Sequence, residues 1–346
     1  MSKLILTGKS LEELEEITKE LGGTKYRAKQ IYNWIYFKSL NSIEEMTDLP
    51  LSFREELNEI AQPSSISIKD KQISEDSTMK YLFELEDGNK IESVLMRFDN
   101  RANLTACIST QVGCPMGCVF CATGKLGLKR NLTAAEIVQQ IHLMQSDTKL
   151  KITNIVFMGQ GEPLLNLDNV LEAIRIFNTD YQVGARRMTL STCGIIPQIN
   201  KLADLNLQST LAISLHAPDS ETRKKIMPVE KKYQMEQLIP ALKSYTMKTG
   251  RRITIEYTLI KDLNDSVDAA KTLSLLISDL KCNVNLIVYN ANEFCEFQKP
   301  TRQSVQKFKY ILEASGKKVT IRLERGADID AACGQLSSKV NSLVNN

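Results

Sequence analysis

The sequence predicts an α/β fold in which a partial or full βα barrel follows a small helical N-terminal domain. From residue 104 onward, short β-branched runs alternate with helical segments, a pattern typical of a parallel sheet. The first 70 or so residues carry helical periodicity. Between these parts, apolar and polar residues alternate on both sides of Asp87-Gly88, as in a hairpin. We therefore expect a helical accessory domain over 1–70, a β-hairpin linker over 71–103 and the barrel over 104–346.

Helix signals define the N-terminal part of the chain. Ser10 and Glu13 have the spacing of a capping box, and Gly22-Gly23 is expected to end the helix that this box begins. A second helix places apolar side chains on one stripe, at Ile31, Trp34 and Ile35. The accessory domain is expected to end near Pro63.

The barrel strands are predicted from β-branched runs that follow a first strand in LTACIST, and they lie at 152–158, 187–192, 209–214, 253–260, 284–289 and 318–323. Predicted helices fill most of the gaps, at 133–145, 168–178, 233–248, 265–279 and 303–315. In parallel folds of this kind, ligands bind where loops leave the C-terminal ends of the strands. We therefore expect the functional residues in those loops.

Composition excludes several classes of protein. Charged residues make up 25% of the chain and hydrophobic residues 42%, which are ordinary globular values, and the net charge of +3 neither requires nor excludes a nucleic-acid partner. No apolar run approaches the roughly 20 residues of a membrane span, and the N-terminus lacks the apolar core of a signal peptide. Eight cysteines are too sparse for a disulfide scaffold. We expect a monomeric cytoplasmic protein with no membrane partner.

Three cysteines in the stretch QVGCPMGCVFC are the strongest chemical signal. Cys114, Cys118 and Cys121 follow the first barrel strand, so they lie at the expected ligand-binding end. Closely spaced thiolates are soft ligands that suit zinc or an iron–sulfur cluster, and unligated thiols are a third possibility. A zinc site needs a fourth donor, for which Cys107, His142 and His216 are candidates without a usual zinc spacing. A four-iron cluster can instead leave one iron open for a small molecule.

Polar residues also follow the other predicted strands. A Gly-x-Gly-Glu turn ends at Glu162, whose carboxylate could hold an ammonium group while Gly161 allows a close backbone approach. Three further strand ends offer polar side chains, namely Ser191, Ser214 with His216, and Asn290. Each alone is typical of a turn or cap, but together they predict the lining of one cofactor site.

The C-x3-C-x2-C spacing, with an aromatic residue before the last cysteine, resembles the signature of the radical S-adenosylmethionine (SAM) enzymes. Further motifs extend the resemblance over nearly the whole chain: GEPLLN, RRMTLST, SLHAP and DIDAACGQL. Together they resemble the RlmN family, dual-specificity methyltransferases that act on adenine C2 in 23S ribosomal RNA and transfer RNA. The related Cfr enzymes, which methylate C8, share much of this pattern. Pro163 and the helical N-terminal region favour RlmN.

This resemblance implies a [4Fe-4S] cluster on Cys114, Cys118 and Cys121, and two molecules of SAM per turnover. It implies that Cys333 is methylated, that a 5′-deoxyadenosyl radical activates this methyl group for addition to C2, and that Cys107 releases the product through a transient disulfide with Cys333. It also implies a reductase that supplies electrons to the cluster, with Glu92 as the proton acceptor. The implied SAM-binding residues are Gly161, Glu162, Ser191, Ser214, Leu215, His216 and Asn290.

The sequence departs from the family pattern at Gln160, at Cys193 and in the segment ANEFCEFQKP after Asn290. These departures leave the SAM assignment intact and bear on the loop geometry after Asn290. Two other classes stay open beside the leading one: a radical SAM enzyme acting on a small metabolite or peptide, and a zinc-stabilised RNA-binding protein. Basic pairs could form a phosphate-binding surface if several share one face. These pairs are Lys129-Arg130, Arg186-Arg187, Arg223-Lys224-Lys225, Lys231-Lys232 and Arg251-Arg252.

Overall fold

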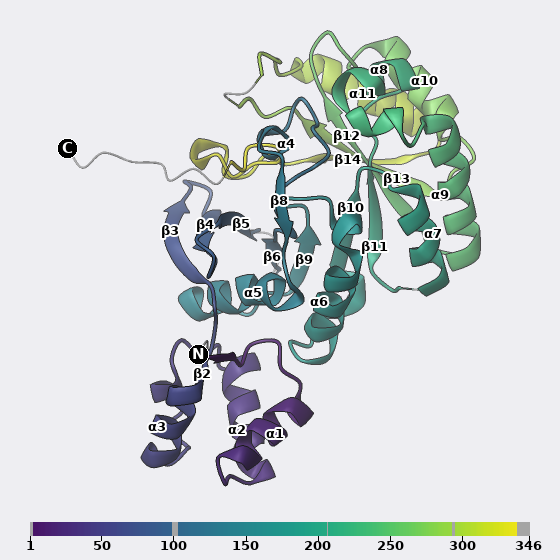
Figure 1. The fold of residues 1–346 in the computed structure, drawn as a ribbon. Helices are drawn as coiled ribbons and strands as arrows, with labels where there is room; N and C mark the ends of the chain where they lie inside the picture. Colours follow the sequence, from purple (N-terminus) through teal and green to yellow (C-terminus); the bar gives the residue numbers. More distant parts are fainter. Residues whose placement is uncertain (1–2, 99–102, 206, 293–294, 338–346) are drawn as a thin grey trace, which may run out of the picture.

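The N-terminal part of the computed structural model is helical, as its periodicity predicts (Figure 1). The structure describes residues 3–98, 103–205, 207–292 and 295–337. The capping box is formed, because the Ser10 hydroxyl accepts from the Glu13 N–H and the Glu13 carboxylate accepts from the Ser10 N–H. The elements here are β1 Leu4–Ile5, α1 Leu11–Glu20, α2 Lys25–Tyr36, the short helix Ile43–Glu45, α3 Leu51–Ile60 and β2 Ala61–Gln62.

A ten-stranded mixed sheet runs through the rest of the chain in the order β14-β13-β12-β11-β10-β9-β6-β5-β4-β3. Neighbours pair in parallel from β6 to β14 and antiparallel from β3 to β6. The strands are β3 Ser67–Ile73, β4 Met79–Glu84, β5 Lys90–Arg97, β6 Leu104–Cys107, β9 Asn154–Phe157, β10 Met188–Thr192, β11 Thr210–Ser214, β12 Ile253–Leu259, β13 Cys282–Val288 and β14 Lys318–Arg322.

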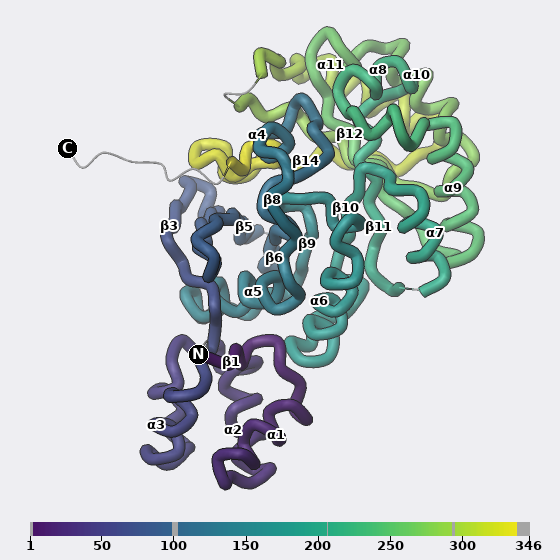
Figure 2. The backbone as a smooth tube through the Cα atoms, in the orientation of Figure 1, coloured from purple at the N-terminus to yellow at the C-terminus, as the bar shows by residue number. Residues whose placement is uncertain are grey.

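The barrel is partial, because within the described residues the outer strands β14 and β3 do not pair with each other. The segment that follows β14 spans the gap between them (Figure 2). Its Asp328 carboxylate accepts from the Ser74 hydroxyl at 2.6 Å, and its Gly326 N–H donates to Asp76 at 3.2 Å. Polar contacts to the β3–β4 turn therefore take the place of a strand pairing.

Helices pack against the outer side of the parallel strands (Figure 1). Among them, α5 is a few residues longer than predicted and α10 is a few residues shorter. Two further helices, α7 and α8, were not predicted from the periodicity. The bounds are α4 Ala122–Lys125, α5 Ala134–Thr148, α6 Leu167–Thr179, α7 Ile196–Leu205, α8 Ser220–Ile226, α9 Met235–Thr249, α10 Val267–Leu276 and α11 Arg302–Ala314. A small two-stranded sheet, β7 Gln111–Gly113 and β8 Leu128–Asn131, encloses the cysteine loop.

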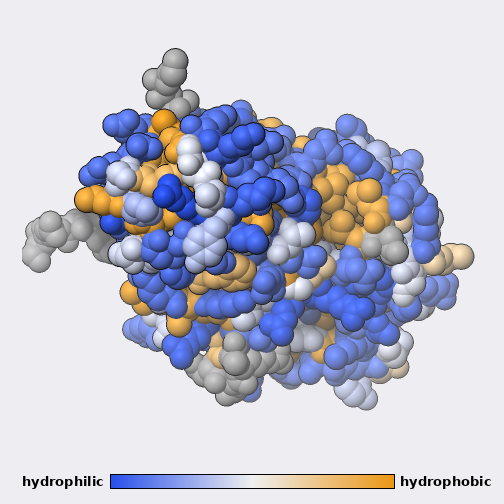
Figure 3. Space-filling model, turned by 90° about the horizontal axis from the view of Figure 1, so that it is seen from below, coloured by the Kyte–Doolittle hydropathy of each residue, from blue (hydrophilic) through white to orange (hydrophobic). Residues whose placement is uncertain are grey.

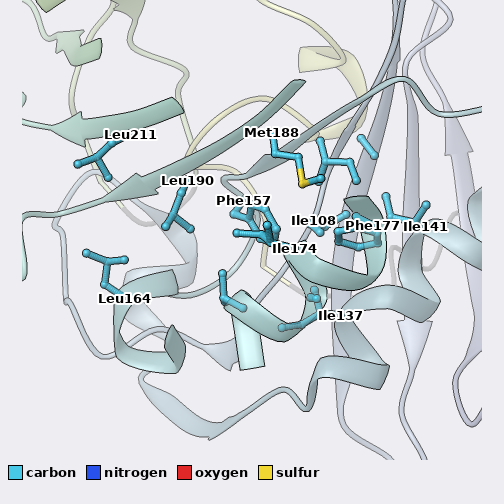
Figure 4. Packing of buried hydrophobic residues seen from close by; sticks show 14 of the residues in the cluster. Ile108, Ile137, Ile141, Phe157, Leu164, Ile174, Phe177, Met188, Leu190 and Leu211 are labelled. Carbon is cyan, nitrogen blue, oxygen red and sulfur yellow. The ribbon is translucent and has the colours of Figure 1, made fainter. Parts of the chain in front are cut away.

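The core lies between these helices and the strands (Figure 4). Phe157 of β9 and Phe177 of α6 are buried with their ring centroids 6.4 Å apart, while Ile137 and Ile141 extend the layer from α5. The surface seen from below is mainly hydrophilic with scattered apolar side chains (Figure 3). No helix in the described part of the chain is long and apolar enough to cross a membrane.

The predicted hairpin differs from a linker in one respect. Strands β4 and β5 pair around the Asp87-Gly88 turn as expected, with Leu82 opposite Glu92. However, β3 precedes the hairpin and β5 pairs with β6, so these strands continue the main sheet. The sequence pattern could not reveal this because strand pairing depends on long-range register. Residues 99–102, at the end of the expected linker, lie outside the described residues.

Candidate active site

Two adjoining cavities lie at the C-terminal ends of the parallel strands. The first, called here the cysteine-loop cavity, is lined by Cys114, Cys118 and Cys121 among others. The second, called here the Cys333 cavity, is lined by Cys107 and Cys333 among others. Both share a wall, which consists of Cys121, Thr123, Met158, Gly159, Ile287, Arg322 and Cys333.

The cysteine loop is held by the small sheet on one side and by α4 on the other. Gly113 has a φ of +77°, and a Cβ there would meet the Gly127 carbonyl oxygen, so only glycine allows this approach of β7 to β8. Burial raises the pKa of Cys114 above its usual range and that of Cys121 to about 11, and neighbouring thiols add to both effects. Thiols so placed stay protonated until a metal stabilises their thiolates.

This donor set fits an iron–sulfur cluster better than zinc. In the described ranges, no three His, Cys, Asp or Glu side chains converge as ligands of a single ion. Zinc requires four donors around one ion, whereas a four-iron cluster takes each thiolate on a different iron. The candidate fourth zinc ligand His142 lies on α5, where its ring contacts the Leu40 carbonyl oxygen at 2.7 Å, and it lines neither cavity.

Glu162 is a buried carboxylate whose contacts are all with neutral groups among the residues described. The Leu164 N–H donates to it at 3.0 Å and the Cys193 N–H at 2.7 Å. Burial raises its pKa above the usual range. Gly161 has a φ of +106°, and a Cβ there would lie 2.7 Å from the Gln111 Cβ atom. The turn therefore places on the cavity wall a buried carboxylate that contacts only neutral groups among the described residues, and such a carboxylate suits an ammonium ligand.

The ends of β10 and β11 add polar groups to the same cavity. The Ser191 and Ser214 hydroxyls lie 3.4 Å apart, and both side chains line the cavity. His216 also lines it in a left-handed conformation with a φ of +55°, and its Nδ1 accepts from the Thr258 N–H at 3.0 Å. Burial lowers the His216 pKa to about 3, so its ring is neutral. Leu215, in contrast, is buried and lines neither cavity.

Cys107 and Cys333 come from opposite edges of the parallel strands and border the same cavity. Cys107 ends β6 within a small apolar cluster, and burial raises its pKa to about 12. Cys333 follows β14 and lines both cavities. The Asn290 amide donates to the Cys333 carbonyl oxygen at 3.3 Å, while its own Oδ1 is buried with no hydrogen-bond partner among the described residues. An orphaned buried acceptor in a cavity wall suits a ligand that donates a hydrogen bond.

Glu92 is buried next to the segment that carries Cys333. Its carboxylate lies 3.4 Å from the Lys80 ammonium group and accepts from the Ser337 N–H at 2.7 Å. It lines neither cavity, so the structure brings it to the C-terminal segment but not to the cavity wall. The departure residue Gln160 also contacts this strand, because its Oε1 accepts from the Glu92 N–H at 3.3 Å.

The other departures from the family pattern also lie at the site. Cys193 lines the cysteine-loop cavity and its thiol contacts that of Cys118. After Asn290, the Asn292 amide donates to the Phe120 carbonyl oxygen at 3.0 Å, which ties this segment to the cysteine loop. Residues 293–294 of the same segment lie outside the described residues.

Comparisons with known proteins agree with this geometry. Residues 108–273 match the model of the radical SAM superfamily, and residues 5–62 match the ribosomal RNA large subunit methyltransferase N-terminal domain. The chain is 47% identical over 342 residues to the probable dual-specificity RNA methyltransferase RlmN of Alkaliphilus oremlandii, covering 98% of this chain and 99% of the relative. The corresponding protein of Thermotoga maritima is 46% identical over 333 residues, covering 95% and 96%.

The chain belongs to the RlmN family. A crystal structure of a radical SAM methyltransferase from Sphaerobacter thermophilus superposes with a TM-score of 0.91 at 40% identity, covering 97% of this chain and all of that one. The prediction of a radical SAM α/β fold is thereby confirmed. As a radical SAM methyltransferase, this RlmN family member uses a [4Fe-4S] cluster and SAM.

The structure of this RlmN family member adds three residues that the motifs missed. Arg322 at the end of β14 lines both cavities, and Glu256 of β12 and Thr123 of α4 line the cysteine-loop cavity. The strand pattern in KVTIRL and ITIEYTLI could have indicated Arg322 and Glu256, because each places a charge in a run that otherwise predicts burial.

Two of the basic residues singled out in the sequence, Arg223 and Arg130, have structural roles. The Arg223 guanidinium is fully buried, pairs with Glu230 at 2.5 Å and donates to the Cys193 carbonyl oxygen at 2.6 Å. It also donates to the Leu215 carbonyl oxygen at 3.2 Å, so it joins the ends of β10 and β11 that line the cavity. Arg223 is therefore unavailable to an RNA phosphate. Arg130 is likewise engaged, with Asp87 and Glu136.

We expect Arg223→Met to lower the free energy of unfolding by about 3–5 kcal/mol, because it leaves the Glu230 charge buried without its partner. Urea denaturation followed by circular dichroism measures this. Lys201→Met is the matched control: its pair with Asp168 is exposed, so the loss should stay below about 1 kcal/mol. Equal effects of the two substitutions would contradict the role assigned to Arg223.

Proposed function

We propose that this enzyme methylates C2 of an adenine in 23S ribosomal RNA and in transfer RNA, with Cys333 carrying the methyl group. The observation that supports this most strongly is that Cys107 and Cys333 border one cavity although they come from opposite edges of the parallel strands. Cys333 also lines the cavity that contains the cysteine loop. A thiol in this position can meet a cofactor on one side and a nucleobase on the other.

The choice of a radical route follows from the target atom. C2 of adenine is electron-poor, so it cannot displace a methyl group from SAM as a nucleophile would. A cluster held by Cys114, Cys118 and Cys121, together with SAM, would supply the radical chemistry that avoids this difficulty. Cys333 first accepts a methyl group as a thiolate, since the thiolate is the competent nucleophile. One hydrogen atom of the Cys333 methyl group would pass to the 5′-deoxyadenosyl radical, this carbon would bond to C2, and one electron of the adduct would return to the cluster. The two stages consume two molecules of SAM per turnover.

Release of the product requires a base and a second thiol. In our proposal Glu92 accepts the C2 proton and the Cys107 thiolate attacks the Cys333 sulfur. The disulfide forms, the bond between this sulfur and the methylene carbon breaks, its electron pair passes to the nucleobase, and the methylene carbon takes up a proton to become the methyl group. A reductant must then restore both thiols. Because Glu92 accepts from the Ser337 N–H, this contact has to open before Glu92 can reach the base.

The partners follow from the same chemistry. The proposal includes a reductase as electron donor for the cluster, and a monomer that acts in the cytoplasm. The target adenine has to be unstacked to bring C2 into a cavity, so we expect a loop adenine as substrate. Cluster-loaded protein incubated with SAM, reductant and unmodified RNA should yield 2-methyladenosine on nucleoside analysis. Formation of 8-methyladenosine would support the Cfr-like alternative instead, and unmodified RNA would overturn the proposal.

Glu162 is proposed to hold the SAM ammonium group, so we expect Glu162→Gln to weaken SAM binding by about 10-fold to 100-fold. This corresponds to the loss of about 1.5–3 kcal/mol from a charged hydrogen bond. Burial raises the pKa of Glu162, so SAM affinity should fall as the pH decreases through that raised value and the carboxylate becomes protonated.

Equilibrium dialysis of labelled SAM against the cluster-loaded protein, repeated at several pH values, measures both effects. Asp168→Asn provides a control carboxylate, because Asp168 pairs with Lys201 on the surface outside both cavities. The assignment of Glu162 would be wrong if Glu162→Gln bound SAM as tightly as Asp168→Asn.

A further inference from the structure

Arg322 is the basic residue that lines both cavities. It ends β14, where its position in the register is opposite Ile287 of β13. In the part of the chain that the structure describes, its guanidinium forms no ion pair and makes one hydrogen bond, from Nη1 to the Met158 sulfur at 3.5 Å. A guanidinium has five N–H donors and stays charged at all relevant pH values. Most of its donor groups therefore have no hydrogen-bond partner among the described residues.

Neither Glu256 nor Glu324 forms an ion pair with Arg322 among the described residues. Glu256 faces the cysteine-loop cavity, where one of its oxygens accepts from Asn285 at 3.0 Å; burial raises its pKa and the Arg322 charge opposes this shift. Glu324 pairs with Lys299 at 2.7 Å. The remaining titratable or charged groups that line the two cavities are Cys107, Cys114, Cys118, Cys121, Glu162, Cys193, His216, Arg325 and Cys333.

Arg325 is the second basic side chain on the Cys333 cavity, but it is already used. It lies 3.5 Å from the Asp76 carboxylate, and its guanidinium packs over the Phe98 ring at 5.3 Å. His216 is a neutral imidazole in its buried position. Of the described cations that line these cavities, Arg322 is therefore the one that forms no ion pair, and its charge acts on Cys333, Glu256 and Cys107.

We infer that Arg322 stabilises the thiolates of Cys107 and Cys333, and so serves both sulfur reactions of the proposed cycle. This rests on the roles proposed for the two thiols. Burial among Val94, Met96 and Leu336 disfavours charge at Cys107, so a nucleophilic thiolate there requires a nearby cation. The Arg322 charge lowers the pKa of Cys107 against the larger opposing effect of burial, and both thiols favour the charged form of Arg322.

The test is the pH dependence of alkylation, which needs no turnover. The full chain, loaded with its cluster and kept anaerobic without SAM, is treated with iodoacetamide from pH 6 to pH 10, and rates at Cys107 and Cys333 are measured by peptide mass spectrometry. Peptides in which Cys333 is already methylated differ in mass and are excluded from the rate. Alkylation can be measured whether or not the protein methylates RNA. A failure of the proposed function can therefore be distinguished from a failure of the inference about Arg322.

For Arg322→Met we expect alkylation of both thiols near pH 7 to slow by about tenfold or more, which corresponds to one unit in the thiol pKa. Arg322→Lys retains the charge and should stay within about threefold of the wild type. Arg302→Met, an exposed arginine on α11, is the matched control, and alkylation of Cys282 serves as an internal reference in every sample.

Two results would overturn the inference. One is an unchanged alkylation profile in Arg322→Met; if SAM binding were weakened at the same time, Arg322 would be a ligand of the SAM carboxylate. The other needs no variant: Cys333 in the wild-type protein is alkylated near pH 7 no faster than in the unfolded chain. This second measurement keeps the test decisive if Arg322→Met does not fold.

Discussion

We expect Cys333→Ala to lower the rate of adenine methylation by about 10⁴-fold or more, because the substitution removes a residue that forms a covalent intermediate. Without this thiol there is no acceptor for the first methyl group, and C2 cannot take a methyl group from SAM directly. Cys333 lies in the wall shared by both cavities. Among the described residues, the other thiol that lines both cavities is that of Cys121, which is a proposed cluster ligand. Methylation is measured as 2-methyladenosine formed by the cluster-loaded protein.

The control for this variant is Cys282→Ala. Cys282 begins β13, at the end of the strand opposite to the cavities, and it lines neither of them. The Cys282→Ala variant should retain methylation close to the wild-type level, and both Cys282→Ala and Cys333→Ala should bind the cluster and SAM. Substantial C2 methylation by Cys333→Ala would contradict the proposed route.

Cys107→Ala is expected to stop at a different stage and to accumulate RNA covalently bound to Cys333. The variant retains the acceptor thiol and the proposed cluster ligands, so the carbon–carbon bond can form. It lacks the thiol that attacks the Cys333 sulfur, so release fails. After nuclease digestion, mass spectrometry should find the Cys333 peptide carrying an adenosine nucleotide joined through a methylene group.

The Cys107→Ala product separates the proposed role from simple burial. A structural Cys107 would give a less stable enzyme that still releases its product, since loss of one buried sulfur mainly lowers stability. The double variant Cys107→Ala/Cys333→Ala should form no adduct. Free 2-methyladenosine at the wild-type rate from Cys107→Ala would exclude Cys107 as the resolving thiol.

Local sequence patterns predicted most of the elements that build the site. β-Branched runs indicated the parallel strands, and spacing placed the cysteine loop after the first of them, because both signals are carried by residues that are neighbours in sequence. The partial closure of the barrel was left open. It depends on contacts between Asp328 and Ser74, which lie far apart in the chain and carry no periodicity.

Residue roles that depend on burial were harder to predict. Arg223 was grouped with basic pairs for RNA, yet it is fully buried and paired with Glu230, because α8 turns this face toward the ends of the strands. Glu92 was expected on the strand before the cluster, but its partner Lys80 could not be predicted, since cross-strand neighbours depend on register. Leu215 was implied as a SAM-binding residue; its side chain is buried and lines neither cavity, and its role stays a prediction.

The most direct test of the central claim follows one carbon atom from Cys333 to RNA. Protein whose Cys333 methyl group carries a carbon isotope is freed of labelled SAM and given unlabelled SAM, reductant and unmodified RNA for a single turnover. We predict that the 2-methyladenosine formed carries the isotope in its methyl group and that the Cys333 peptide loses it. If the methyl carbon of the RNA came instead from the unlabelled SAM while Cys333 kept its label, Cys333 would not be the methyl carrier.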